Sequence, residues 1–99
     1  MSEPLWRTPL RMPEDHPCLP GHFPGRPLVP GVWLLEQVAQ ALQAWRGERL
    51  ARIVEAKFLA PLRPAETAEL ALTERVGRLR FEISRDGVLL ARGVIEGAP

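Results

Sequence analysis

The sequence has little of several features that would point directly to a function. It holds one cysteine, Cys18, which excludes an internal disulfide framework and leaves too few thiols for a cysteine-rich zinc site. Thirteen Lys and Arg residues against twelve Asp and Glu give a net charge of +1, which excludes a strongly basic nucleic-acid-binding surface as the main activity. No apolar run approaches the roughly 20 residues of a membrane span. No apolar signal region follows Met1, so we expect a cytoplasmic protein.

The length of 99 residues predicts a single domain over residues 1–99. A chain this short buries only about 60–65% of the surface that it exposes when unfolded, so its own core is thin. With 45% hydrophobic residues it is too apolar to be disordered. Proline is the residue in excess. There are eleven, and eight fall in the first thirty residues: Pro4, Pro9, Pro13, Pro17, Pro20, Pro24, Pro27 and Pro30.

A helix is predicted over residues 31–46, directly after the proline-rich third. From Glu14 to Pro30 the prolines forbid regular helix and sheet, and an extended, polyproline-like path is expected. Pro30 suits the first helical position, and Gly47 is a usual C-terminal stop. One broad half of the helical wheel is apolar, with Leu34, Leu35, Val38, Ala39, Ala41, Leu42 and Trp45. The narrower polar arc holds Glu36, Gln37, Gln40 and Gln43, together with Trp33 and Ala44.

The rest of the chain has the alternation of strands. A short strand over 5–12 is confined to a sheet edge by Pro9, which lacks a backbone donor. Further strands are predicted over 54–60, from Ala68 to Thr73, from Leu79 to Ser84 and over 88–96. Turn signals at Gly77-Arg78 and Asp86-Gly87 make the last three strands a meander. The pattern predicts an α+β architecture of four or five antiparallel strands that curl around one long helix.

Two histidines and twelve acids are the candidates for proton transfer near neutral pH. His22 lies in a segment stiffened by prolines, and Glu36 follows fourteen residues later in the first two turns of the helix. At the margin of the apolar face Glu36 could be partly buried, which would raise its pKa and let it act as an acid. The sequence has no nucleophile elbow, phosphate cradle or metal-ligand set.

Simpler interpretations of the same residues stay open. A histidine in a loop next to proline is often a surface residue, and Glu36 also fits an acid that the helix dipole favours. The Pro24, Pro27 and Pro30 spacing with Arg26 is typical of a polyproline ligand, although the run leads straight into a helix. Trp33 fits an interface or the lining of a pocket. Cys18 fits an inert small hydrophobe.

Residues 21–41, GHFPGRPLVPGVWLLEQVAQA, closely resemble the signature of the hotdog-fold 3-hydroxyacyl-[acyl-carrier-protein] dehydratases of fatty acid synthesis. A weaker resemblance continues over residues 56–64. The resemblance implies that His22 removes the α-proton of the 3-hydroxyacyl thioester. Glu36, contributed by the other subunit of a dimer, protonates the departing hydroxyl, and the Gly31 N–H receives the thioester carbonyl. A free N–H at a helix start suits developing enolate charge, so the physical chemistry agrees with these roles.

The same resemblance implies a hotdog fold, in which a curved antiparallel sheet of about five strands wraps around the central helix. It also implies an acyl carrier protein as partner, whose phosphopantetheine arm arrives with the substrate, and no metal or redox cofactor. We expect a homodimer, with a heterodimer containing another hotdog subunit as the alternative. Besides the catalytic residues, the substrate site is expected to involve Phe23, Pro30, Val32, Trp33 and Gln40. Candidates for contact with an acidic carrier protein are Arg46, Arg49 and Arg63.

One departure from the family concerns length. Only 21 residues precede His22, enough for one strand, whereas the common dehydratases have an additional strand there. This resembles short stand-alone members of secondary pathways that process polyene or polyketide-like acyl chains. Two other functions remain open at this point: a hotdog thioesterase that hydrolyses acyl thioesters, and a catalytically silent subunit that binds acyl chains or pairs with an active partner.

Overall fold

One helix and one antiparallel sheet form the described part of the chain, residues 5–13 and 28–99 of a computed structural model. The sheet order is β1-β3-β4-β5-β2, and every neighbouring pair is antiparallel. This confirms the predicted α+β architecture, with β1 at an edge. The path expected for residues 14–27 lies outside the described residues. The elements are β1 (Leu5–Leu10), α1 (Gly31–Arg46), β2 (Arg49–Phe58), β3 (Ala68–Arg75), β4 (Arg78–Arg85) and β5 (Val88–Ala98).

The helix has the predicted bounds, but Pro30 is its N-cap and not its first helical residue. Pro30 has the extended backbone angles φ −64° and ψ 143°, and its side chain makes no capping hydrogen bond. The N–H groups of Trp33 and Leu34 donate to its carbonyl, at 3.1 and 3.3 Å. At the other end Gly47 adopts the left-handed conformation with φ 68°, and its N–H donates to the Gln43 carbonyl at 2.8 Å. The chain therefore leaves the helix directly toward β2.

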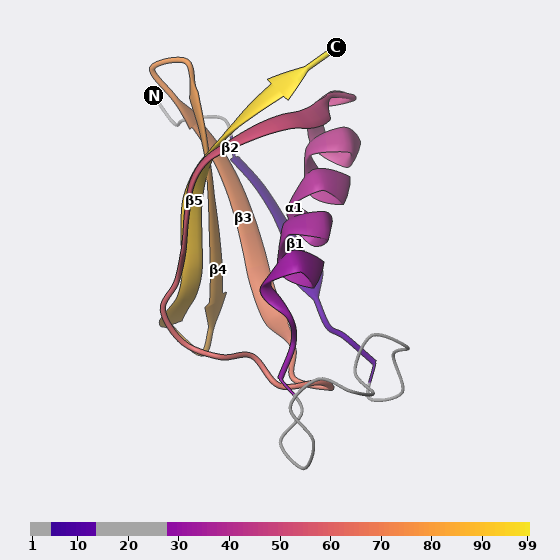
Figure 1. Ribbon diagram of the computed structural model, residues 1–99, viewed down its shortest axis with the longest axis vertical. Helices are drawn as coiled ribbons and strands as arrows, with labels where there is room; N and C mark the ends of the chain where they lie inside the picture. Colours follow the sequence, from indigo (N-terminus) through magenta and orange to yellow (C-terminus); the bar gives the residue numbers. More distant parts are fainter. Residues whose placement is uncertain (1–4, 14–27) are drawn as a thin grey trace.

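One face of α1 lies along the sheet, as Figure 1 shows. Leu34, Val38, Ala41 and Leu42 are buried there, as the wheel predicts. Trp33 shares the polar arc of the wheel, yet it is only 8% exposed and belongs to the core cluster. One aromatic residue of that arc is therefore buried, while its place in the substrate site stays a prediction.

The inner face of the sheet supplies the other half of the core. The alternation predicted for β3 and β4 is confirmed, because every second residue is buried. These residues are Ala68, Leu70, Leu72, Leu79, Phe81 and Ile83. They form one cluster with the buried residues of α1. Full burial of each larger apolar side chain is worth about 1.5–3 kcal/mol, so this contact dominates the stability of so small a domain.

Strand β2 differs most from its predicted range of 54–60. It begins at Arg49, ends at Phe58 and has register shifts between Leu50 and Arg52 and between Ile53 and Glu55. Each bulge inserts an extra residue and interrupts the alternation that identifies a strand in a sequence. The other strand bounds differ by a few residues, since β1 ends at Leu10 and β5 continues to Ala98.

The C-terminal end of α1 is fastened to β3 by an ion pair. The two guanidinium nitrogens of Arg46 lie 2.9 Å from the two carboxylate oxygens of Glu74. The hydrogen bond from Arg46 lowers the pKa of Glu74, and the same bond raises the pKa of Arg46. Arg46 also stacks over the Trp45 ring, 4.1 Å from its centre. Its guanidinium is thus already engaged within the chain.

The turn between β3 and β4 is one residue earlier than predicted. Arg75 pairs with Arg78, so the two turn residues are Val76 and Gly77, both in the left-handed region with φ 51° and 74°. Asp86 and Gly87 form the predicted turn between β4 and β5 with nearly the same angles, 51° and 78°. Asp and Gly suit this conformation, whereas a β-branched residue is strained in it.

Replacing Val76 with Asn should therefore stabilise the protein by about 1 kcal/mol, because Asn tolerates a positive φ. Val76 is 94% exposed, so the substitution removes no core contact. The matched variant Asp86→Val places the same strain in the other turn and should lower the free energy of unfolding by a similar amount. Urea denaturation measures both values. Equal stability of Val76→Asn and the wild type would contradict the assigned strain.

Candidate active site

The start of α1 is held by the segment between β2 and β3. The Val29 N–H donates to the Leu62 carbonyl at 2.8 Å, and both residues are buried. Two residues later the helix begins at Gly31. The N–H groups of Gly31 and Val32 precede Trp33, whose N–H makes the first bond to the Pro30 carbonyl. The first N–H groups of a helix lack intrahelical acceptors, and the helix dipole adds positive potential there. This end of α1 can therefore receive a negatively charged oxygen.

The same β2–β3 segment is fixed to the rest of the fold. The Leu59 N–H donates to the Leu90 carbonyl at 2.8 Å, and the Ala65 N–H donates to the Met12 carbonyl at 2.8 Å. A Glu66 carboxylate oxygen accepts from the Arg63 N–H at 2.9 Å. In Figure 1 this segment passes the end of the molecule where the helix begins. The helix start is thus positioned by strands, not by the helix alone.

Phe58, the last residue of β2, packs against Gly31. A Cβ atom placed on Gly31 would lie 3.0 Å from Cζ of the Phe58 ring and 3.3 Å from Cε1 and Cε2. Half of the Phe58 side chain remains exposed. Sequence reasoning did not identify this contact, since only the alternation of β2 drew attention to Phe58. Nothing in the sequence pattern places the end of β2 over the start of α1.

Glu36 is exposed, which corrects the expectation of partial burial within this chain. It lies on the same side of α1 as Val32, because residues four apart share a helix face. Val32 is 66% exposed. The described part of this chain leaves that side of the helix uncovered. Any burial of Glu36 would therefore have to come from another surface.

Gln40 lies toward β1. It lines a groove of about 230 Å³ between α1 and β1, together with Gln37, Ala41 and Ala44 of the helix. Trp6 of β1 forms part of the opposite wall, and its indole N–H is buried without a hydrogen-bond acceptor. Gly31 is not among the residues that line this groove.

Other predicted residues are placed in part or not at all. His22 and Phe23 lie outside the described residues, as does Cys18. The side chains of Arg49 and Arg63 are exposed, unlike that of Arg46. Among the described residues no group of three or more His, Cys, Asp or Glu side chains could hold a metal ion. No helix in residues 5–13 and 28–99 is long and apolar enough to cross a membrane.

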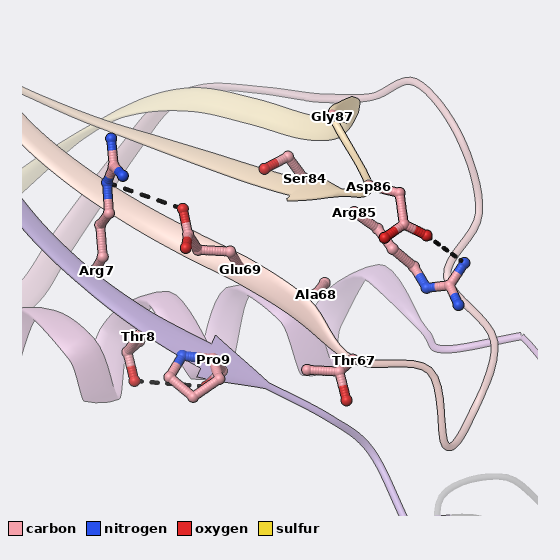
Figure 2. Close-up of a pocket in the computed structure, with 10 residues that line it drawn as sticks. All are labelled: Arg7, Thr8, Pro9, Thr67, Ala68, Glu69, Ser84, Arg85, Asp86 and Gly87. Atoms are coloured by element: carbon pink, nitrogen blue, oxygen red, sulfur yellow. Dashed lines mark hydrogen bonds and ion pairs between the residues drawn. The ribbon is translucent and has the colours of Figure 1, made fainter.

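A second groove, of about 430 Å³, lies near the ends of β1, β3 and β4 (Figure 2). Two exposed ion pairs lie in it, Arg7 with Glu69 at 3.8 Å and Arg85 with Asp86 at 3.6 Å. None of the residues predicted for the active site lines it. Exposed pairs of this kind contribute little to stability or recognition, so we assign this groove no role in the chemistry.

One protein-family model matches nearly the whole chain. A family model described as ApeI-like, ApeI dehydratase, matches residues 2–94. The 3-hydroxyacyl-[acyl-carrier-protein] dehydratase FabZ of Haemophilus influenzae (strain PittEE) is 40% identical over 80 residues, covering 68% of this chain and 54% of that protein. FabZ of Herpetosiphon aurantiacus is 30% identical over 93 residues, covering 80% and 66%. The chain thus spans about half to two thirds of the length of these relatives.

Solved structures agree with the sequence matches. The dehydratase heterocomplex ApeI:P from Xenorhabdus doucetiae superposes with a TM-score of 0.83 at 25% identity, covering 99% of this chain and 90% of that one. An uncharacterized protein from Erwinia carotovora subsp. atroseptica gives a TM-score of 0.81 at 28% identity, covering 96% and 83%. The likeness to the ApeI structure confirms the predicted hotdog fold.

The contact between Gly31 and Phe58 predicts a coupling in stability. Gly31→Ala forces the ring to move, which should cancel the helix-propensity gain of up to about 1 kcal/mol. In a Phe58→Ala background the space is free, so the same substitution should stabilise the protein by about 0.5–1 kcal/mol. Urea denaturation of the four proteins gives the coupling energy. Additivity within about 0.3 kcal/mol would show that the two residues act independently.

Proposed function

The chain belongs to the ApeI-like dehydratase family, and on that premise we propose that it removes water from a 3-hydroxyacyl thioester on an acyl carrier protein to give the trans-2-enoyl thioester. His22 acts as the base that takes the α-proton. Glu36 is the acid that protonates the hydroxyl as it leaves as water. The observation that carries the proposal is the helix start at Gly31, with N–H groups that precede the first bonded donors of α1.

The Gly31 N–H binds the thioester carbonyl oxygen in this reaction. Removal of the α-proton moves negative charge onto that oxygen, and a preorganised N–H at a helix N-terminus stabilises it. Pro30 and Val32 flank Gly31 and contact the bound acyl group. Phe23, Trp33 and Gln40 remain predictions for the rest of the substrate site. The base, the acid and the donor are protein groups, so the proposed reaction uses no metal or redox cofactor.

Helix geometry favours a Glu36 that comes from a second subunit. Glu36 lies five residues after Gly31, which is roughly 7.5 Å along the axis and about 140° around it. The Gly31 N–H points in the opposite direction, beyond the start of the helix. Glu36 is exposed on a side of α1 that the described residues leave uncovered, where it can reach a substrate that is bound to a neighbouring chain. We therefore propose that each site combines His22 and Gly31 of one subunit with Glu36 of another.

The surface for that second subunit is the free edge of β2. Among the described residues this strand pairs only with β5, and it exposes Ile53 and Val54 at 39% and 42%. An unpaired apolar edge is a template for another strand. The partner is a second copy of the chain or another hotdog subunit, the latter in line with the ApeI:P heterocomplex of the structural neighbour.

The carrier protein delivers the substrate on its phosphopantetheine arm. Arg49 and Arg63 are exposed and can meet an acidic carrier surface, whereas Arg46 is held by Glu74. We place the reaction in the cytoplasm. We also propose that it acts in a secondary pathway on polyene or polyketide-like acyl chains.

Two inactive variants should regain activity when they are mixed, if each site is shared between two subunits. His22→Ala and Glu36→Gln should each lower kcat by about 10²–10⁴-fold, because each removes a proton-transfer group. After the two are mixed and allowed to exchange subunits, half of the dimers contain one intact site. Activity should then recover to about a quarter of the wild type. The assay follows conversion of a 3-hydroxybutyryl thioester to the crotonyl thioester.

Three results would count against this scheme. Release of free thiol without interconversion of the two acyl forms would identify a thioesterase. A wild type that is inactive on these substrates but forms a stable complex with another hotdog chain would identify a silent partner subunit. A mixture that remains inactive while both variants dimerise would show that His22 and Glu36 do not combine across subunits.

The proposed interface predicts a charge-sensitive dimer. Val54→Lys places a charge on the free edge of β2 and should shift the protein from dimer to monomer at micromolar concentration, with an unchanged circular dichroism spectrum. Leu5→Lys is the matched control, since Leu5 is 46% exposed on β1 at the opposite edge of the sheet. Sedimentation velocity measures both. A Val54→Lys variant as dimeric as the control would rule out the β2 edge as the interface.

A further inference from the structure

Phe58 is more exposed than its position on the inner face of the sheet would lead one to expect. Its partner in β5 is Ala91, which is fully buried on the inner face of the sheet, yet half of the Phe58 side chain is exposed. It is also outside the core cluster formed by the buried residues of α1 and the sheet. The end of its ring touches the first residue of the helix instead. Phe58 thus presents a half-covered aromatic surface beside the helix start.

The position of this ring relative to the helix is fixed from both sides. Directly after Phe58, the Leu59 N–H donates to the Leu90 carbonyl at 2.8 Å and holds the end of β2 against β5. Directly before the helix, the Val29 N–H donates to the buried Leu62 at 2.8 Å. Both backbones are therefore anchored to the β2–β3 segment and the sheet. The ring does not need to be brought to Gly31 by a ligand.

An aromatic ring next to a helix start reduces the access of water to the N–H groups there. Water competes for such donors, and an electrostatic interaction strengthens where water is excluded. The Phe58 ring covers Gly31 on the side where a Cβ atom would project. Its exposed half offers an apolar surface at the same place. A thioester whose oxygen accepts from the Gly31 N–H would thus have its neighbouring carbon atoms beside the ring.

We propose that Phe58 is a positioning residue of the dehydration site, which shields the Gly31 N–H from water and packs against the acyl carbons next to the thioester carbonyl. This rests on the proposed dehydratase function. The ring acts on the first carbons of the acyl group, which all substrates share. Its contribution should therefore be independent of chain length and should affect turnover more than binding of the distal chain.

The test compares Phe58→Ala and Phe58→Leu with the wild type on 3-hydroxybutyryl and 3-hydroxyoctanoyl thioesters of the carrier protein. Phe58→Ala should lower kcat about tenfold on both substrates with little change in KM, less than the roughly 10²–10³-fold loss when an oxyanion donor itself is removed. Phe58→Leu should recover most of that loss because it keeps an apolar wall. Leu5→Ala, an exposed apolar residue on β1, should leave kcat within about twofold.

Sedimentation velocity on each variant separates positioning from assembly. If Phe58→Ala is monomeric, a dimeric Phe58→Gln decides, because it keeps a long side chain but removes the apolar wall. Full activity of Phe58→Gln with a normal KM on both substrates would overturn the proposal. A loss that appears only with the octanoyl substrate would overturn it too, because the ring would then contact the distal chain. A wild type without dehydratase activity refutes the proposed function. An active wild type with an equally active, dimeric Phe58→Ala refutes only the role of Phe58.

Discussion

One helix packs against the inner face of the sheet, and this packing constraint fixes where the helix begins and which of its residues stay exposed. Val38 and Leu42 are fully buried in the core cluster that α1 forms with the sheet, so α1 cannot slide without opening the core. The Arg46–Glu74 pair at one end and the Val29–Leu62 hydrogen bond before the other end hold the same position. The position of the helix start is therefore set by the core packing. The groups next to it are held in position by the same packing.

The packing of α1 on the sheet leaves the other side of the helix uncovered. The sheet covers one face of α1 and leaves Val32 and Glu36 exposed, and the edge strand β2 exposes apolar side chains of its own. In the proposed reaction a second subunit covers this side and supplies the acid. The thin core expected from 99 residues agrees with such a chain, because a protomer that shares its site need not bury all of its apolar surface alone.

Local signals account for what the sequence could predict. Pro30 and Gly47 bound the helix, and strict alternation identified β3 and β4, because these features act within a few residues. The start of β2 escaped prediction because two bulges interrupt its period. The burial of Trp33 could not be predicted from the wheel, because a wheel records the direction of each Cα–Cβ bond and not where a large side chain ends.

The candidate site was predictable only in part, because a sequence pattern reports local features and not contacts between distant elements. Its motif residues follow from the resemblance, whereas the contact between Phe58 and Gly31 joins two elements through tertiary packing.

The pairing of Leu5 with Thr73 spans most of the chain, while β3, β4 and β5 are joined by two-residue turns. Local contacts form faster than distant ones, so we expect the meander to form before β1 pairs with β3. During synthesis the apolar face of α1 leaves the ribosome before its sheet exists, and a chaperone would find its binding segment there.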